Sequence, residues 1–247
     1  MAAASDRDSI LSSITDPFDL WRIVNCLGEN LKQILQSISS DETLQMLHLK
    51  DSETCATILH IAVCEPDAKA VERLLECVSE EERYILLCAQ DRNQFTPIHY
   101  PCFHDNNRVL GLMNRLLKEE TWYKLLQITS ASGSTPLHVS ALRGNTQAIT
   151  AIADSLTALQ LIHLLRITDD YGRTPLQWAE YYGKHAAAEL LQNYQTKALI
   201  DVALQQADQT GSNSTPYITE FFYTFSVSNF PSRLSLIAVF DYSFYGV

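Results

Sequence analysis

The chain has 247 residues, enough for one large domain or two small ones, and 46% of them are hydrophobic while 19% are charged. This composition is that of a folded globular protein and excludes disorder throughout. The formal net charge of -11 argues against a nucleic-acid partner, because binding to phosphates needs a basic surface. The same acidity repels anionic membranes, and no segment has about 18 uninterrupted apolar residues for a transmembrane helix. We therefore expect a soluble protein.

The six cysteines are widely spaced, and none forms a C-x-x-C pair. This spacing predicts neither a zinc site nor a compact disulfide framework, so no metal or cofactor is expected. The N-terminal segment 1–13 carries acidic side chains and lacks a basic region followed by an apolar core. We therefore expect no secretory signal and a cytoplasmic protein whose thiols stay reduced.

A four-residue motif recurs along the chain each time the residue number rises by 39. Its copies are Thr96-Pro97-Ile98-His99, Thr135-Pro136-Leu137-His138 and Thr174-Pro175-Leu176-Gln177, with a degenerate copy at Thr57-Ile58-Leu59-His60. The register divides the chain without gaps into residues 52–90, 91–129, 130–168 and 169–207, and a weaker copy occupies residues 13–51. We predict about five stacked repeats over residues 13–207, preceded by a leader over residues 1–12.

Each copy is predicted to contain two helices and a third, short helical piece. The first helix should begin at the Thr-Pro pair, because threonine is a good N-cap and proline suits the first helical position. It should end at Gly144 and Gly183 in two copies, and at Pro66 and Asp105 in the others. The second helix carries apolar residues at helical spacing. Ser79, followed three residues later by an acid, has capping-box form and predicts the third piece.

The third helical piece should end near paired leucines that recur in register at Leu86-Leu87, Leu125-Leu126 and Leu164-Leu165. We expect these leucines to be buried between repeats.

In combination, these features resemble ankyrin repeats. The resemblance rests on the tetrapeptides and on residues that keep the same place in their copies: Gly133 and Gly172, Asp91 and Asp169, Ala62 and Ala179, and the helix-ending glycines. It covers roughly residues 13–207 and implies an all-α solenoid of stacked helix-turn-helix repeats. An ordinary ankyrin period is about 33 residues, so a period of 39 places six extra residues between the second helix and the hairpin finger.

His60, His99 and His138 recur at fixed spacing and could supply a base or a metal ligand. Packed helices lie about 10 Å apart, however, which is too far for two of these side chains to share one metal. The resemblance implies a structural role in which the ring bonds to backbone of the turn. Gln177 replaces the histidine in the last copy. A glutamine can make the same kind of hydrogen bond but cannot act as a catalytic base, so the replacement favours the structural role.

The enzymatic alternative is a Cys–His nucleophile pair, for example Cys64 or Cys102 with His60, His99 or His104. Nothing local marks these thiols as activated, and most free cysteines are small core residues. The sequence also lacks a P-loop, a G-x-S-x-G and a G-x-G-x-x-G motif. We therefore predict no catalysis and no small-molecule substrate.

Acidic pairs and triplets recur in three copies, at Asp41-Glu42, Glu80-Glu81-Glu82 and Glu119-Glu120. They are interpreted either as solvated charges at helix N-termini or as a strip that docks a basic partner.

The resemblance implies binding through the finger tips and the exposed face of the first helix. Aromatic and arginine side chains at these positions are typical of interface hot spots. We expect a non-catalytic protein-interaction module or scaffold that binds an unidentified protein partner on the concave face of the solenoid, and a monomer is compatible with this role. The predicted binding residues are Phe95, Phe103, Arg143, Tyr171, Arg173, Tyr181 and Tyr182.

Residues 208–247 have no repeat register and hold ten of the 23 aromatic residues. Phe221, Tyr223, Phe225 and Val227 alternate as in a strand. This tail could cap the last repeat, covering Tyr181 or Tyr182, could remain an uncovered sticky segment, or could be an unusual terminus of no selected function. An adaptor that uses the tail for membrane contact or self-association is therefore the alternative function.

Overall fold

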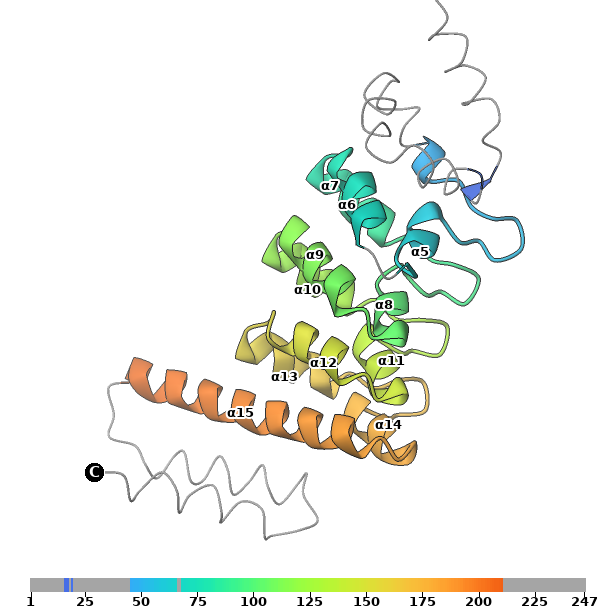
Figure 1. The fold of residues 1–247 in the computed structure, drawn as a ribbon. Coiled ribbons are helices and arrows are strands. Elements are labelled where there is room, and N and C mark those ends of the chain that lie inside the picture. Colours follow the sequence, from blue (N-terminus) through green and yellow to red (C-terminus); the bar gives the residue numbers. More distant parts are fainter. Residues whose placement is uncertain (1–15, 18, 20–44, 66–67, 211–247) are drawn as a thin grey trace, which may run out of the picture. The chain divides into compact units, whose positions relative to one another are not determined.

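The computed structural model describes residues 16–17, 19, 45–65 and 68–210, and in these residues it contains helices and no strand. Most of the predicted first repeat and the tail from residue 211 lie outside the described residues. The described part is all-α, as the sequence predicts (Figure 1). Its helices are α5 Ile58–Ala62, α6 Lys69–Glu76, α7 Glu80–Leu87, α8 His99–His104, α9 Asn107–Leu116, α10 Glu119–Leu126, α11 Pro136–Arg143, α12 Thr146–Ala153, α13 Ala158–Arg166, α14 Pro175–Tyr181 and α15 His185–Thr210.

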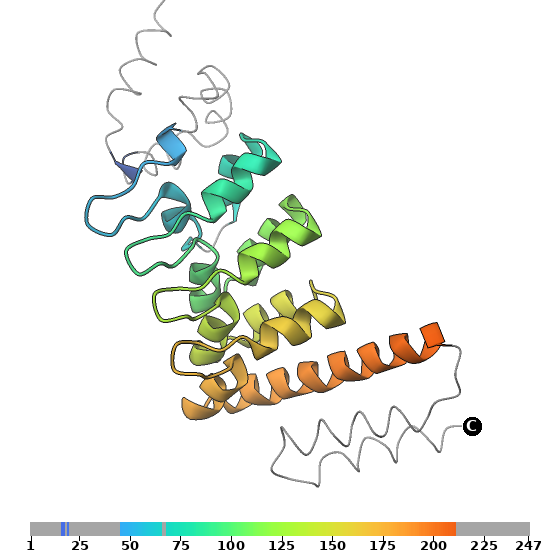
Figure 2. The ribbon, with the colours of Figure 1, turned by 180° about the vertical axis from the view of Figure 1, so that it is seen from behind.

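Three successive repeats each contain a first helix, a second helix and a short third helix, in the orders α5–α7, α8–α10 and α11–α13. The third helices confirm the prediction of an extra helical piece and account for the added residues of the long period. Loops follow them and lead to the next first helix; we call these loops the fingers. Figures 1 and 2 show the fingers on one side of the stack and the third helices on the other.

The first helices begin where a threonine caps them, with one exception. Thr135 and Thr174 accept a hydrogen bond from the backbone three residues on, and proline follows each at the first helical position. In the preceding repeat α8 begins only at His99, two residues after Pro97. Pro101 explains this difference, because it has no N–H to donate to the carbonyl of Pro97 and so cannot close the first α-helical turn.

Each finger is folded by a polar side chain at its start. Asp91 accepts hydrogen bonds from the backbone of Asn93 and Phe95 through one oxygen and from the Tyr100 hydroxyl through the other. Asp169 does the same for its own finger and accepts from the indole of Trp178 at 2.6 Å. These bonds fix the finger to the first helix of the same repeat.

Neighbouring fingers are joined by backbone hydrogen bonds that repeat in register. The N–H groups of Arg92, Ala131 and Asp170 donate to carbonyls of the preceding finger at 2.7, 3.0 and 3.1 Å. Gly133 has a left-handed φ of 73°, and a Cβ there would lie only 2.6 Å from the Asp170 carboxylate. Glycine is therefore required at this position both by the turn and by the close approach of the next finger.

The third helices lock one repeat to the next through position 83 and its counterpart 122. The Arg83 guanidinium donates to the carbonyl of Leu116, at the end of the second helix of the next repeat. The Trp122 indole donates at 2.8 Å to the hydroxyl of Ser155, which stands one full repeat period after Leu116. The extra helix thus carries a joint of its own, although the two side chains differ completely.

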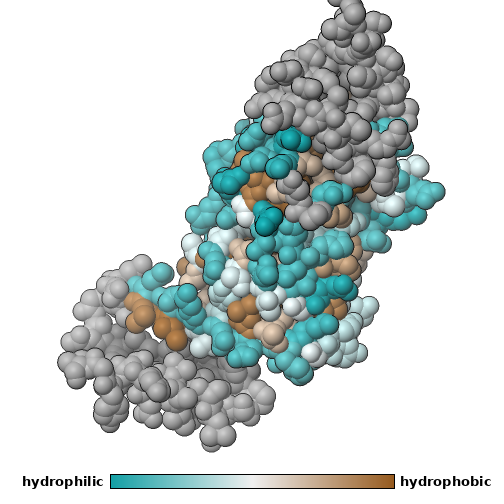
Figure 3. Space-filling model, viewed as in Figure 1, coloured by the Kyte–Doolittle hydropathy of each residue, from teal (hydrophilic) through white to brown (hydrophobic). Residues whose placement is uncertain are grey.

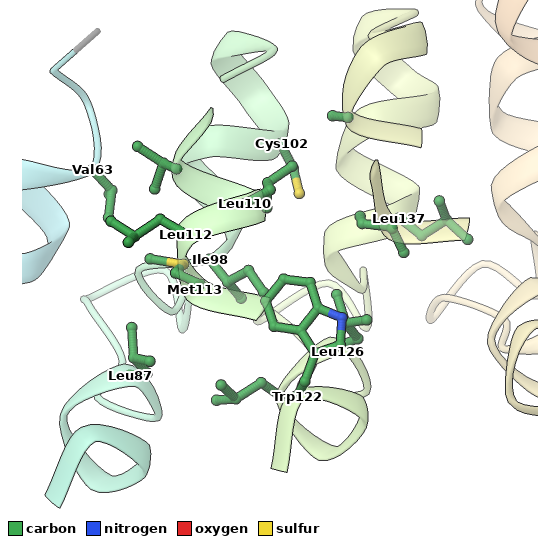
Figure 4. Close-up of a cluster of buried hydrophobic side chains, with 14 of the residues drawn as sticks. Val63, Leu87, Ile98, Cys102, Leu110, Leu112, Met113, Trp122, Leu126 and Leu137 are labelled. Atoms are coloured by element: carbon green, nitrogen blue, oxygen red, sulfur yellow. The ribbon is translucent and has the colours of Figure 1, made fainter. Parts of the chain in front are cut away.

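The core runs continuously through the described repeats. Figure 4 shows Trp122 among side chains from α8, α9, α10 and α11, with Leu87 and Val63 reaching in from the repeat before. Trp122, Leu125 and Leu126 have no exposed surface. The paired leucines of the other two third helices are at most 5% exposed, which confirms their predicted burial.

The last repeat differs because its second and third helices form the single helix α15. Thr157 caps α13 together with Gln160, whereas its counterpart Thr196 lies inside α15 and donates to the carbonyl of Gln192. Leu199 stands where Gln160 stands and cannot complete a capping box. The chain divides into two compact units, residues 1–198 and 199–247, and α15 continues across the boundary.

Replacing Leu125 by alanine should lower the free energy of unfolding by about 2–5 kcal/mol, because it leaves a cavity in a fully buried joint. Urea denaturation of the full chain measures the change. Lys124→Ala is the matched control, since its pair with Glu120 is exposed to solvent and stabilises the fold little. A loss below about 1 kcal/mol for Leu125→Ala would contradict the assignment of the core.

Candidate functional site

The recurring histidines are structural, as the sequence predicts. In each case Nδ1 accepts from the backbone N–H of the threonine that opens the tetrapeptide, three residues earlier. The Nε2 atoms of His60, His99 and His138 reach backbone carbonyls of the next repeat, those of Phe95, Ser134 and Arg173, at 3.0, 3.2 and 3.0 Å. Because Nδ1 accepts, Nε2 carries the proton and donates, so one neutral ring joins two repeats.

Burial keeps these rings neutral. It lowers the pKa of His60 and His138, and it lowers the pKa of His99 to about 4. With both ring nitrogens engaged, none can serve as a base or a ligand without breaking a joint. Among the described residues no group of three His, Cys, Asp or Glu side chains is placed to hold a metal ion.

The cysteines named for a nucleophile pair are not activated. Burial raises the pKa of Cys102 to about 12, and partial loss of water around the sulfur together with the neighbouring Glu65 carboxylate raises the pKa of Cys64. Cys64 bonds to the backbone carbonyl of His60 and not to its ring. Cys64 is also exposed, so the expectation that the cysteines are small core residues holds for Cys102 and fails for Cys64, which lies past the end of α5. A thiolate nucleophile is not supported by either environment.

The acidic clusters of the described repeats stand in the first turns of α7 and α10. Glu82 completes the capping box of α7, and Glu80 pairs with Lys118 of the next repeat at 2.9 Å. Glu119 accepts from Gln160, and Glu120 pairs with Lys124. These partners favour the interpretation of helix-terminal charges over that of a docking strip. Asp41 and Glu42 lie outside the described residues.

Three of the predicted binding residues form a first group around a pocket. The Arg143 guanidinium lies 4.2 Å from the centre of the Phe103 ring, and both side chains are exposed. Phe95 is half-buried, with its ring 5.2 Å from that of His99. Phe95 and Phe103 border a pocket of about 220 Å³. Its lining residues are Asn93, Phe95, His99, Tyr100, Phe103, His104 and Val139.

The other four form a second group, one repeat further along. The Arg173 guanidinium lies 4.4 Å from the Tyr181 ring centre and 5.3 Å from that of Tyr171. Tyr182 packs edge-on against Tyr181, with ring centres 5.1 Å apart. Trp178 completes this group, with its ring centre 5.4 Å from that of Tyr182. Trp178 packs against the edge of the core and is half-buried.

The two groups belong to one surface, which we call the finger face: the fingers and the C-terminal ends of α8, α11 and α14. α11 packs against both α8 and α14, so equivalent positions of these helices follow one another. Phe103, Leu142 and Tyr181 share one repeat position, and His104, Arg143 and Tyr182 share the next. The predicted binding residues do not include five residues of the pocket lining, namely Asn93, His99, Tyr100, His104 and Val139. Asn93 and His104 lie within two residues of Phe95 and Phe103 in the sequence, whereas no sequence signal marks Tyr100 and Val139 as pocket residues.

The surface otherwise has a mixed polarity. On the side seen in Figure 3, hydrophilic residues cover most of the described surface and apolar ones form separate patches. No helix within the described residues is long and apolar enough to cross a membrane.

A family model describes part of this architecture. Residues 107–203 match the model "Ankyrin repeats (3 copies)". Residues 107–203 are therefore ankyrin repeats. No curated protein matches the chain. Ankyrin repeats are generally protein-interaction modules without catalytic activity, and they stack as helix-turn-helix solenoids. The helices, fingers and histidine joints of residues 57–106 repeat the same pattern ahead of the match.

The neutral histidine joints predict acid sensitivity. A pKa lowered in the folded state means that the unfolded chain binds the proton first, so stability is complete above about pH 6.5 and falls below it. For His99 the loss should reach roughly 2 kcal/mol at pH 5. His99→Gln keeps the cap, as Gln177 does for Thr174, and should remove this part of the pH dependence. Urea unfolding of both proteins at pH 7.5 and pH 5 measures this change. An equal loss of unfolding free energy in the two proteins would contradict the neutral, buried state assigned to His99.

Proposed function

We propose that this protein is a non-catalytic interaction module that binds a protein partner on its finger face. This surface corresponds to the concave face that the resemblance to ankyrin repeats implies. The observation that carries the proposal is the exposure of large aromatic side chains there. Tyr171 and Tyr181 are each 69% exposed, Tyr182 is 47% exposed and Phe103 is 40% exposed. Exposing such large apolar surfaces to water is unfavourable, and none of these side chains takes part in the joints between repeats.

The chemistry of these side chains supports a protein as the ligand. Tyrosine and arginine are enriched among the residues that dominate binding energy at protein interfaces. Here they are held in place before any partner arrives, because Arg173 stacks with Tyr171 and Tyr181. Side chains already ordered in the free protein lose less entropy on binding.

We also propose that the protein acts as a cytoplasmic scaffold or adaptor. A reducing compartment suits the free thiols of Cys55, Cys64, Cys88 and Cys102. A stack of repeats offers an extended surface on which one partner can be held without enclosing it.

The test compares partners captured by the full chain and by the double variant Tyr181→Ala/Tyr182→Ala, quantified by mass spectrometry. Proteins that bind the finger face should be lost from the variant, since truncating an anchor weakens binding by about 2 kcal/mol or more. Ile85→Ala is the control, because Ile85 is 54% exposed on α7, away from the fingers. Thermal unfolding confirms that each variant is folded. An unchanged set of partners in the double variant would refute binding at this face.

A further inference from the structure

The pocket exists because one repeat carries a small residue at a position that is large on either side. Val139 occupies the same place in its repeat as Tyr100 and Trp178 do in theirs. A valine leaves open the space that a ring would fill, and Phe95, His99, Tyr100 and Phe103 border the resulting hollow of about 220 Å³. An apolar cavity of about 150 Å³ is enough to bind benzene, so this pocket has room for an aromatic or branched side chain.

Arg143 stacks on Phe103, which is one of the residues that line this pocket. None of the ion pairs between described residues includes Arg143; those pairs join Arg115, Lys118 and Lys124 to glutamates. The Arg143 guanidinium instead rests on the face of the Phe103 ring. Stacking leaves the in-plane N–H groups of arginine available, and their fork matches a carboxylate.

A second centre of the same kind follows in the next repeat. Arg173 stacks with Tyr171 and Tyr181 and takes part in no ion pair between described residues. The finger face thus presents two unpaired guanidinium groups beside aromatic rings on a chain whose formal net charge is -11. Because that charge opposes highly anionic ligands, single carboxylates suit these centres better than phosphate groups.

We propose that the ligand of the finger face is an extended protein segment in which an aromatic or branched apolar residue stands close to an aspartate or glutamate. The apolar side chain fills the Val139 pocket, and the carboxylate binds Arg143. A second acidic residue further along the segment binds Arg173. The side-chain amide of Asn93, on the pocket rim, is exposed and can bind the backbone of the segment. This proposal rests on the proposed function and specifies the chemistry of its partner.

The probe is a displayed library of random peptides of about twelve residues, selected on the immobilised full chain. Selected peptides should combine an aromatic or branched residue with a nearby acid. For a synthetic selected peptide, Arg143→Gln in the protein and Asp→Asn in the peptide should each weaken binding about tenfold. The two changes together should weaken it little more than either alone, because both remove the same contact.

Val139→Tyr tests the pocket separately. It restores the ring size that Tyr100 and Trp178 have at this position, and Ser130→Asp alongside it restores their carboxylate partner. The variant with the filled pocket should remain folded but should no longer bind the selected peptides. Arg115→Gln is the control for charge, because Arg115 is equally exposed but lies on α9. Arg143→Gln remains informative if the pocket variants do not fold.

Peptides selected without acids, or additive effects of Arg143→Gln and Asp→Asn, would overturn the proposal. Self-association of the chain that Arg143→Gln abolishes, measured by sedimentation, would do so too, since a second copy would then be the ligand. If captured partners depend on Tyr181 and Tyr182 but not on Arg143, the proposed function stands and this proposal fails. If they depend on none of the three, the proposed function fails as well.

Discussion

The stacking of this protein depends on a buried, neutral imidazole at each joint. One ring nitrogen closes the N-terminus of a first helix, and the other holds a backbone carbonyl of the next repeat 35 residues later. Nδ1 must be unprotonated to accept from the backbone N–H, and Nε2 must carry the proton to donate to the carbonyl, so the ring must stay in the Nε2-protonated tautomer. Burial enforces this state by lowering the pKa, and a carbonyl left without its donor would cost about 1–3 kcal/mol at each joint.

The other joints between repeats also recur at equivalent positions of successive repeats. Finger backbones pair at every step, and the third helices reach the end of the second helix in the next repeat. At the start of two second helices, Asn106 donates to the carbonyl of Glu65, just past α5, and Asn145 donates to the carbonyl of Cys102 in α8. Because the histidine, finger and third-helix bonds each span a fixed number of residues, an insertion within one repeat would break several of them at once. The long period is therefore tolerated because each of the three successive repeats carries the same extra helix.

The sequence was sufficient to predict the parts of the fold that repetition determines. The Thr-Pro caps, the capping box at Ser79 and the paired leucines each appear in several copies, and local rules describe them. The helix boundaries differ from those that the repeat pattern predicts where one copy carries an unusual residue. Pro101 delays the start of α8, and Leu199 in place of a capping glutamine lets α15 run on. Such effects depend on one missing hydrogen bond, and the periodic pattern conceals them.

The candidate site was predictable only in part, for a related reason. Exposed side chains such as Phe103, Arg143 and Tyr181 follow from their register positions. A pocket depends on the size of a neighbour in another repeat, and Val139 reveals nothing until it is compared with Tyr100 and Trp178 in space. The stacking of Arg143 on Phe103 likewise joins side chains from two successive repeats, which no local pattern indicates.

The residue that opens the pocket also weakens its own finger. Asp91 and Asp169 hold their fingers through backbone N–H groups and a Tyr or Trp side chain, with distances from 2.6 to 3.0 Å. In the repeat between them Ser130 accepts one backbone bond at 3.4 Å, and Val139 can donate nothing. Neutral hydroxyls form weaker hydrogen bonds than a carboxylate, so this finger has lost stabilisation that both neighbours keep. Folding alone would favour Asp and an aromatic residue here, as in both neighbouring repeats, and the proposed binding of a partner would account for the middle repeat having neither.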